Sequence, residues 1–250
     1  GLASEGFNVI TTTFAPFQTM RCCEQIKVNL GYMQQKLCMV GLASGLVLGT
    51  LGYTHCCIED VGILRSIPNL TIISPADGGE VVKAVTASLK HKNSVYIRLT
   101  GGANVEQIYD DDYDFRIGQS ITLKKGKDIS IFASGTMVKV GLDCSKILND
   151  NNISAEVVNM HTIKPIDVQK VNESAKNSKL IVSIEEHNVI GGLGSAIAEC
   201  LANIKNSPKL IFFGINDTYS KGGEYSYLKE KFGLTPSVIS EKIISKFNEE

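Results

Sequence analysis

The sequence of 250 residues lacks several features that would assign a class of protein directly. It has no tryptophan, and no apolar run approaches the roughly 20 residues that a membrane-spanning helix needs. No signal peptide is visible. The formal net charge of −1 gives no indication of binding to nucleic acid or to an acidic membrane surface. With 43% hydrophobic residues, however, the chain can form a substantial core.

The cysteines lack the spacing of known cysteine motifs. There are seven, none in a CxxC motif, and two pairs are adjacent, Cys22 with Cys23 and Cys56 with Cys57. An odd number in this arrangement argues against a disulfide framework and against zinc. We therefore expect reduced, mostly buried thiols and a cytoplasmic location. The motifs GxxxxGK[ST], GxSxG and HExxH are also absent, which gives no indication of a P-loop, a serine hydrolase or a zinc protease.

Short apolar runs alternate with amphipathic stretches along the whole chain. The first half has FNVITTT, LCMVGLA, LTIISP and SVYIRLT, and a regular helical stretch with Asp77 near its start. In the second half, DISIFASG, SAEVVNM, KLIVSIEE and KLIFFGI are each followed by a helical pattern. Strands separated by helices predict βαβ units and parallel sheets. We expect two α/β domains, each a mainly parallel sheet flanked by helices, over residues 1–105 and 117–250.

The segment between these domains, residues 106–116, has the sequence EQIYDDDYDFR. It is acidic and irregular, and the EF-hand spacing is missing, so a linker is favoured over a calcium loop. The opening residues GLASEGF resemble the end of a helix that stops at Gly6. We therefore expect the first domain to lack its start.

The segment TTTFAPFQTM places Phe14 and Phe17 between a predicted strand and a helical stretch, QTMRCCEQIKVNLGY. Such a junction lies at the carboxyl end of a sheet, where open α/β folds bind their ligands. The two rings either close the edge of the core or form a platform for a flat ligand. The pattern alone favours packing.

A glycine-rich segment, GLASGLVLGTLGYTHCCIEDVG, begins at the end of the next predicted strand. Gly41, Gly45, Gly49 and Gly52 allow sharp turns and close approach of the backbone to a ligand. His55 lies at the end of this loop. Because histidine exchanges protons near neutral pH, it is either an acid/base candidate or a capping or packed histidine, and the spacing does not decide.

Two further segments carry candidate groups. In EEHNVIGGLGSAIAEC, a strand ends in a glycine-rich turn that leads into a helix, whose N-terminus can hold an anion. The pattern is not GxGxxG, so packing of helix on sheet is favoured for the turn, and a structural role for His187. Arg98 either binds an anion or pairs with Glu59 or Asp60, and the pair is favoured.

In this order, these segments resemble the transketolase family. The resemblance covers the pyrimidine-binding domain from partway in and the whole C-terminal domain. It implies thiamine diphosphate as cofactor, with Phe17 stacking on its pyrimidine ring, Phe14 and Met20 as further walls, and His55 as the active-site histidine. The matching motifs are GLASEG, FAPFQTMRCCEQI, GYTHCCIED, LRSIPNLTIISPADGGE, KPID, SIEEHNVIGGLGSAIAE and KFGLT.

The sequence departs from the family pattern in three respects. The cofactor-activating glutamate of the family would precede Gly1, and the GDG pattern of the diphosphate-binding domain is absent. At the sugar-facing positions, Ala43 replaces a histidine and Leu51 replaces an aspartate, while Tyr53 adds an aromatic wall. Gly101 lies near where a phosphate-binding arginine is expected.

The resemblance therefore implies the C-terminal subunit of a split transketolase-like enzyme, which transfers a two-carbon ketol unit. The expected partner is an N-terminal subunit with the diphosphate-binding domain, which would also bind a divalent metal, Mg or Ca. We expect self-association across both domains and a heterotetramer. A deoxyxylulose-phosphate-synthase-like or 2-oxoacid-decarboxylating subunit, or a non-catalytic assembly subunit, remain alternatives.

Overall fold

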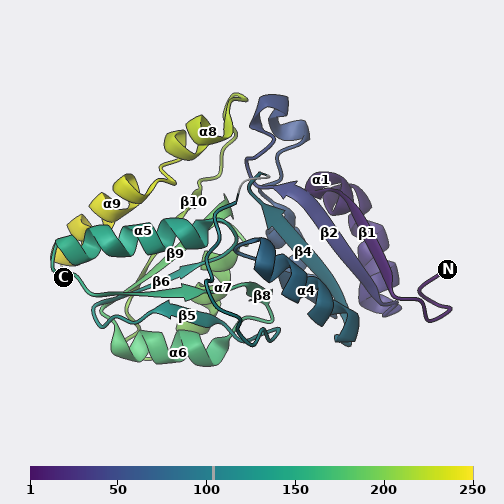
Figure 1. Cartoon of the computed structure of the whole chain (residues 1–250), viewed down its shortest axis with the longest axis horizontal. Coiled ribbons are helices and arrows are strands. Elements are labelled where there is room, and N and C mark those ends of the chain that lie inside the picture. Colours follow the sequence, from purple (N-terminus) through teal and green to yellow (C-terminus); the bar gives the residue numbers. More distant parts are fainter. Residues whose placement is uncertain (103–104, 250) are drawn as a thin grey trace.

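The computed structural model describes residues 1–102 and 105–249 and contains two sheets, one centred in each half of the chain (Figure 1). Each sheet has five strands among the described residues, mostly parallel, and helices flank both. The predicted fold class is confirmed. The N-terminus lies at the outer side of the first sheet, and the C-terminus lies at the far end of the second (Figure 1).

The first sheet has the strand order β1-β2-β4-β3-β8, and all neighbours are parallel except β3 and β8. Its helices include α4, which begins where predicted, because the Asp77 carboxylate accepts a hydrogen bond from the Glu80 amide at 2.8 Å. The elements are β1 Val9–Phe14, β2 Leu37–Ser44, α3 Asp60–Arg65, β3 Leu70–Ile73, α4 Gly78–Lys90, β4 Ser94–Thr100 and β8 Thr162–Lys164.

The helical stretch after β1 is broken rather than continuous. It starts with Pro16 in the first turn and changes type where the Thr19 hydroxyl bonds back to the Ala15 carbonyl oxygen at 2.7 Å. Such side-chain bonds compete with the regular helix ladder. The pieces are α1 Ala15–Gln18, the 3₁₀ turn η1 Met20–Cys22, α2 Cys23–Gln25 and a π-helix, η2 Ile26–Tyr32.

The second sheet has the order β10-β9-β6-β7-β5, in which β5 alone of the described strands is antiparallel. Helices α5 and α9 cover one face and α6 and α7 the other. The elements are β5 Ile121–Lys124, β6 Ile129–Ala133, α5 Met137–Asp150, β7 Ala155–Asn159, α6 Val168–Asn177, β9 Leu180–Asn188, α7 Leu193–Leu201, β10 Lys209–Ile215, α8 Tyr225–Lys231 and α9 Pro236–Asn248.

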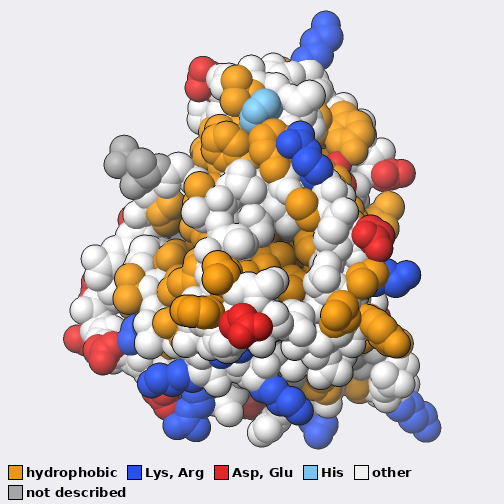
Figure 2. Space-filling view, turned by 90° about the vertical axis from the view of Figure 1, so that its right-hand side faces the viewer, with side chains coloured by type: hydrophobic (Ala, Val, Ile, Leu, Met, Phe, Trp, Pro, Cys, Tyr) orange, Lys and Arg blue, Asp and Glu red, His pale blue; other side chains and the backbone are white. Residues whose placement is uncertain are grey.

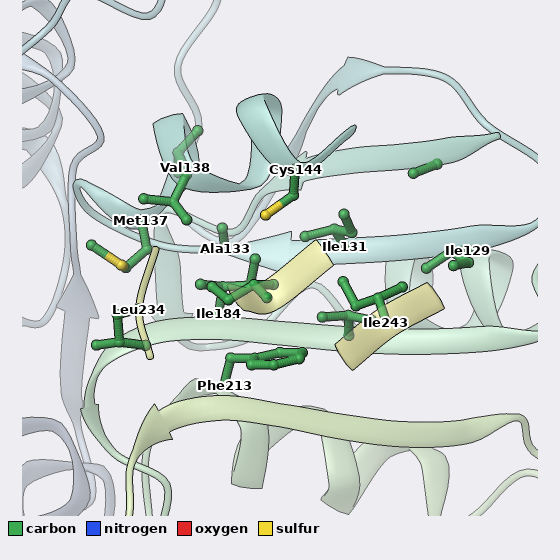
Figure 3. Packing of buried hydrophobic residues seen from close by; sticks show 14 of the residues in the cluster. Ile129, Ile131, Ala133, Met137, Val138, Cys144, Ile184, Phe213, Leu234 and Ile243 are labelled. Carbon is green, nitrogen blue, oxygen red and sulfur yellow. The ribbon is translucent and has the colours of Figure 1, made fainter. Parts of the chain in front are cut away.

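The larger core of this half lies between its sheet and helices α5 and α9 (Figure 3). Side chains of β6, β9 and β10 point toward these helices and interdigitate with side chains of the helices. Ile131, Ile184 and Phe213 come from the strands, and Cys144 and Ile243 come from α5 and α9. Fully burying each such side chain contributes roughly 1.5–3 kcal/mol, so the second sheet is a stable support for whatever its edge carries.

The two halves are joined by more than the linker. Strand β8 comes from the second half but pairs with β3 of the first sheet, with Ile73 opposite Thr162. Residues 105–119 run without a helix or strand, and Tyr109 and Tyr113 stack there at 4.0 Å. Both hydroxyls bond to the buried Glu80 carboxylate.

Within the described part of the chain, no helix is long and apolar enough to cross a membrane.

Candidate functional site

Two phenylalanines and a histidine meet at the carboxyl edge of the first sheet. The ring centroids of Phe14 and Phe17 lie 6.1 Å apart, and that of His55 lies 5.9 Å from Phe14 and 5.4 Å from Phe17. All three pairs meet edge to face, the preferred geometry of aromatic pairs. Because Phe14 is 37% exposed and the other two rings are half-buried, these rings do not close the core.

The backbone places each ring separately. Phe14 ends β1 in register with Leu42 of β2, and Phe17 follows within α1. The Arg21 guanidinium carbon lies 4.0 Å from the Phe17 ring centroid, which fixes that ring from one side. Met20, predicted to be a third wall, begins η1 and is half-buried.

Figure 2 shows the face of the molecule on the side of the first sheet. Hydrophobic side chains gather on it, and one histidine side chain lies among them toward the top. Exposed apolar side chains on the elements of the first sheet include Ile10, Phe14 and Leu42. An open apolar and aromatic surface beside a titratable ring suits a flat ligand that needs proton transfer.

A hydrogen bond with Thr54 orients the His55 ring. Nδ1 of His55 lies 2.9 Å from the Thr54 hydroxyl oxygen, and the same oxygen lies 3.2 Å from the Leu51 carbonyl oxygen. Nε2 is the ring nitrogen that takes no part in this bond.

The predicted substrate-facing residues lie in different surroundings. Ala43 has a φ of +53° at the end of β2 and lines a cavity of about 310 Å³ together with Leu42 and Gly101. Leu51, in the 3₁₀ segment η3 Gly49–Thr54, is 54% exposed. Tyr53 packs its ring against Tyr219 at 4.6 Å, so this aromatic wall is supported by the second half of the chain.

Arg98 and His187 are buried parts of the structure. The Arg98 guanidinium pairs with the Asp60 carboxylate at 2.9 Å, as predicted, and Tyr96 donates to the same carboxylate at 2.7 Å. Although burial opposes its charge, Asp60, Tyr96 and Glu186 beside it raise the pKa of Arg98. His187 accepts from the Gly62 amide at 3.3 Å, and burial lowers its pKa to about 4, so it is neutral.

The glycine-rich turn before α7 holds one of the chain's own carboxylates. Glu185 accepts hydrogen bonds from the amides of Leu193 at 2.7 Å and Gly194 at 2.8 Å. A Cβ on Gly194 would lie 2.3 Å from the Phe212 ring, so the helix can approach the sheet only with glycine there. The prediction of a packing turn is confirmed. Burial raises the pKa of Glu185 to about 7.

The sequence pattern did not predict the position of Glu186. Its carboxylate is fully buried and accepts a hydrogen bond from the Leu46 amide, 140 residues away in the chain, at 2.6 Å. The available signal was a buried strand that ends in two carboxylates, which need partners when they leave water. Spacing could not identify those partners.

The rings at the first edge fit a thiamine cofactor. Phe14 and Phe17 offer the apolar aromatic surface that a flat heteroaromatic ring prefers, and the His55 ring contacts both. Within residues 1–102 and 105–249, no group of three or more His, Cys, Asp or Glu side chains could hold a metal ion. That a partner binds the metal stays a prediction.

Two family models match this chain and identify its family. Residues 1–104 match the family model of the transketolase pyrimidine-binding domain, and residues 118–239 match that of the transketolase C-terminal domain. The chain belongs to the transketolase family. Within it, the aromatic cluster lies in the pyrimidine-binding domain, and the Glu185 turn lies in the C-terminal domain.

Similar proteins include subunits of transketolases. The chain is 39% identical over 240 residues to the 6-deoxy-6-sulfo-D-fructose transketolase subunit SqwH of Clostridium sp. strain MSTE9, covering 96% of this chain and 74% of that protein. It is 33% identical over 235 residues to one of the subunits of the apulose-4-phosphate transketolase of Phocaeicola vulgatus, covering 94% of this chain and 74% of that protein.

A solved structure described as "Split gene transketolase, inactive beta4 tetramer" has the same fold. It superposes with a TM-score of 0.88 at 32% sequence identity, covering 99% of this chain and 78% of that chain. The chain therefore matches a subunit of a split transketolase along almost its whole length.

Proposed function

We propose that this chain is the C-terminal subunit of a cytoplasmic, split transketolase-like enzyme. It takes part in the transfer of a two-carbon ketol unit from a ketose to an aldose acceptor, with thiamine diphosphate as cofactor. The observation that carries the proposal is the open cluster of Phe14, Phe17 and His55 at the carboxyl edge of the pyrimidine-binding domain. The relatives named as transketolase subunits support it.

Phe17 and Phe14 hold the pyrimidine ring of the cofactor, and Met20 is the third wall. A stacked or edge-to-face aromatic contact contributes roughly 0.5–1.5 kcal/mol beyond the buried area. Bound there, thiamine diphosphate supplies the nucleophilic carbon and the electron sink that carbon–carbon bond cleavage requires. The chain's own residues orient that ring and exclude water from one side of it.

His55 is the proposed group that transfers a proton to or from the substrate. Its Nδ1 is engaged by the Thr54 hydroxyl at 2.9 Å, so Nε2 is the atom assigned to accept a proton from, or return one to, a substrate oxygen. The hydrogen bond between Thr54 and His55 also orients the ring, as a general acid/base group requires.

The proposed partner is an N-terminal subunit that carries the diphosphate-binding domain and binds Mg or Ca. Together the subunits form a heterotetramer, in which this chain self-associates across its two domains. These domains are the pyrimidine-binding domain over residues 1–105 and the C-terminal domain over residues 117–250, with 106–116 as linker. The solved relative described as an inactive tetramer of a split-gene transketolase supports a need for a second subunit.

The proposed substrate carries fewer or differently placed hydroxyl groups at the carbons that face Leu51. A sugar hydroxyl buried against Leu51 without a partner would cost ~1–3 kcal/mol, roughly a tenfold to hundredfold loss in specificity. Ala43 likewise supplies no polar group. One relative is named for 6-deoxy-6-sulfo-D-fructose, a sugar with a sulfo group in place of one hydroxyl, which supports a substrate with differently placed polar groups.

A second candidate is a subunit with deoxyxylulose-phosphate-synthase-like activity, which would use pyruvate as donor. The chain is 30% identical over 249 residues to a 1-deoxy-D-xylulose-5-phosphate synthase of Caldanaerobacter subterraneus, but spans 40% of that protein. A non-catalytic assembly subunit is the third.

Product analysis separates these functions. The chain is mixed with its N-terminal subunit, thiamine diphosphate and Mg²⁺, and is offered a ketose donor or pyruvate with an aldose acceptor. We expect a ketol product from the ketose and no carbon dioxide from pyruvate. Decarboxylation of pyruvate would favour the second function, and no product from either donor would favour an assembly role.

A further inference from the structure

The loop that carries His55 has a closed neck. The Gly45 amide donates to the Cys57 carbonyl oxygen at 2.7 Å, and the Cys57 amide donates to the Gly45 carbonyl oxygen at 3.0 Å. Residues 45–57, here called the His55 loop, therefore leave the sheet and return at one point. His55 lies two residues before Cys57, so its backbone position depends on the two bonds that close this neck.

The neck is built around the Glu186 carboxylate, which comes from β9 of the C-terminal domain. One oxygen accepts from the Leu46 amide at 2.6 Å, and the other accepts from the Tyr225 hydroxyl at 2.6 Å and the Thr136 hydroxyl at 3.2 Å. Gly45 has a φ of +78°, and a Cβ there would lie 2.2 Å from the carboxylate oxygen. The carboxylate can therefore approach the neck this closely only with glycine at position 45.

Arg98 ties the same point to the first sheet. Its guanidinium donates to the Glu186 carbonyl oxygen at 2.9 Å and to the Cys57 carbonyl oxygen at 3.3 Å. The Arg98 guanidinium therefore holds the neck at Cys57 from the first domain. The Glu186 carboxylate holds it at Leu46 from the C-terminal domain. Groups buried this fully and bonded this completely are rigid, because any displacement leaves polar atoms unpaired.

The tip of the His55 loop, η3, also contacts the C-terminal domain. It lies beside α8 at the top of Figure 1. The Gly223 amide donates to the Gly49 carbonyl oxygen at 2.9 Å. Tyr53 packs on Tyr219 and accepts from the Ser220 amide at 3.3 Å. Neck and tip are thus both fixed by residues that contribute no atom to the aromatic cluster.

We propose that Glu186 is a positioning residue of the reaction: from the C-terminal domain, it sets the neck of the His55 loop and so the direction of the His55 ring. This inference rests on the proposed function. It assigns the C-terminal domain a part in catalysis without contact with cofactor or substrate. A displacement of a reacting group by about 1 Å costs on the order of 10²-fold in rate, so a loosened neck should be visible in kcat.

The test compares Glu186→Ala with Glu186→Gln in the reconstituted complex. Glu186→Ala should lower kcat by about 10²-fold with little change in KM. Glu186→Gln should recover most of this loss, because its side-chain oxygen still accepts from the Leu46 amide. In the chain labelled at its histidines, the ring resonance of His55 should move in Glu186→Ala and stay in place in Glu186→Gln.

Glu156→Ala is the matched control. Glu156 is also a buried carboxylate of the C-terminal domain, but its partners are Ser130, Ser174 and Lys170, all within that domain. It should lose stability while kcat and the His55 resonance stay unchanged. If Glu186→Ala does not fold, Tyr225→Phe removes one bond to the carboxylate and should lower kcat by about 2–10-fold, the range of one lost hydrogen bond.

Equal falls of kcat in the Glu186 and Glu156 variants, or an unmoved His55 resonance, would overturn the inference. So would a normal kcat in Tyr225→Phe where it is the variant available. A wild-type complex without ketol transfer would contradict the proposed function instead, while the resonance still tests the role of Glu186.

Discussion

The carboxyl edges of the two sheets are built alike but used differently. At each edge a strand leads through a glycine-rich segment toward a helix. In the pyrimidine-binding domain this edge carries partly exposed aromatic rings and His55. In the C-terminal domain it carries Glu185 and His187, which are buried and bonded within the protein. The first edge is open to a ligand, and the second is closed by its own side chains.

The comparison shows what a glycine-rich turn does and does not indicate. The turn lets a helix or a loop approach a strand end, but a ligand can enter only if no side chain already fills the space. Glu185 fills the helix N-terminus, because its carboxyl oxygens accept the amide hydrogen bonds that an external anion would otherwise take. Mutations at the two edges should therefore have different consequences.

The largest difference is expected from the histidines. His55→Ala in the complete complex should lower kcat by ~10²–10⁴, the range for a positioned acid/base group. Its melting temperature should barely change, because a half-exposed loop histidine contributes little to the core. The control, His187→Ala, should instead lose stability, since its burial is complete. A large stability loss with near-normal turnover in His55→Ala would show that His55, like His187, has a structural role.

A loss of stability is expected when the buried ion pair of Arg98 with Asp60 is broken. Arg98→Met leaves the buried Asp60 carboxylate without its cation and should destabilise the protein by about 3–5 kcal/mol. Denaturant unfolding of the purified chain measures this. The exposed pair of Lys146 with Asp143 is the control, and Lys146→Met should cost about 0–1 kcal/mol. Similar small losses in both variants would show that the buried pair is not structural.

Glu185 should make stability depend on pH. Its pKa of about 7 in the folded protein lies above its ordinary 4.5, so the folded protein keeps a proton that the unfolded chain has lost. This contribution to stability is complete below pH 4.5 and is lost as the pH rises to about 7. Between about pH 5.5 and pH 8, wild type should lose roughly 2 kcal/mol relative to Glu185→Gln.

Denaturation of both proteins at the two pH values measures the difference. Because His187 titrates in both, its effect largely cancels in this comparison. A constant difference between wild type and Glu185→Gln would mean that Glu185 keeps an ordinary pKa in its closed site.

The smallest effect is expected at the aromatic platform. Phe17→Leu keeps an apolar side chain but removes the ring face, so it should weaken cofactor binding to the complex by about 0.5–1.5 kcal/mol, roughly 2–12-fold in Kd. Phe212→Leu at the closed edge is the control and should leave Kd unchanged. Equal effects of the two variants would remove the distinction between the edges.

Much of the fold could be predicted from the sequence. Continuous apolar runs identified β2, β4, β6 and β9 because strands buried on both faces need them. The short strands β5 and β8 were missed, since ITLK and TIK carry no clear period and form through pairing with distant strands. The break in the helix after Phe17 depends on the Thr19 side chain, which a periodic pattern does not reveal.

The site was less accessible to sequence reasoning. Spacing alone left His55 undecided and favoured packing for the phenylalanines, and only the family resemblance joined them. The structure brings the three rings together, and their role in binding a cofactor stays a prediction. The bond of Glu186 to Leu46 spans 140 residues, which no local pattern can encode.

The central claim is that the open edge of this chain is one part of a cofactor site and needs a partner to complete it. Calorimetry with thiamine diphosphate and Mg²⁺ tests it most directly, on the chain alone and on the chain mixed with an N-terminal transketolase subunit. The account predicts no tight binding to the chain alone and clear binding to the mixture. Micromolar binding of the cofactor to the isolated chain would contradict it.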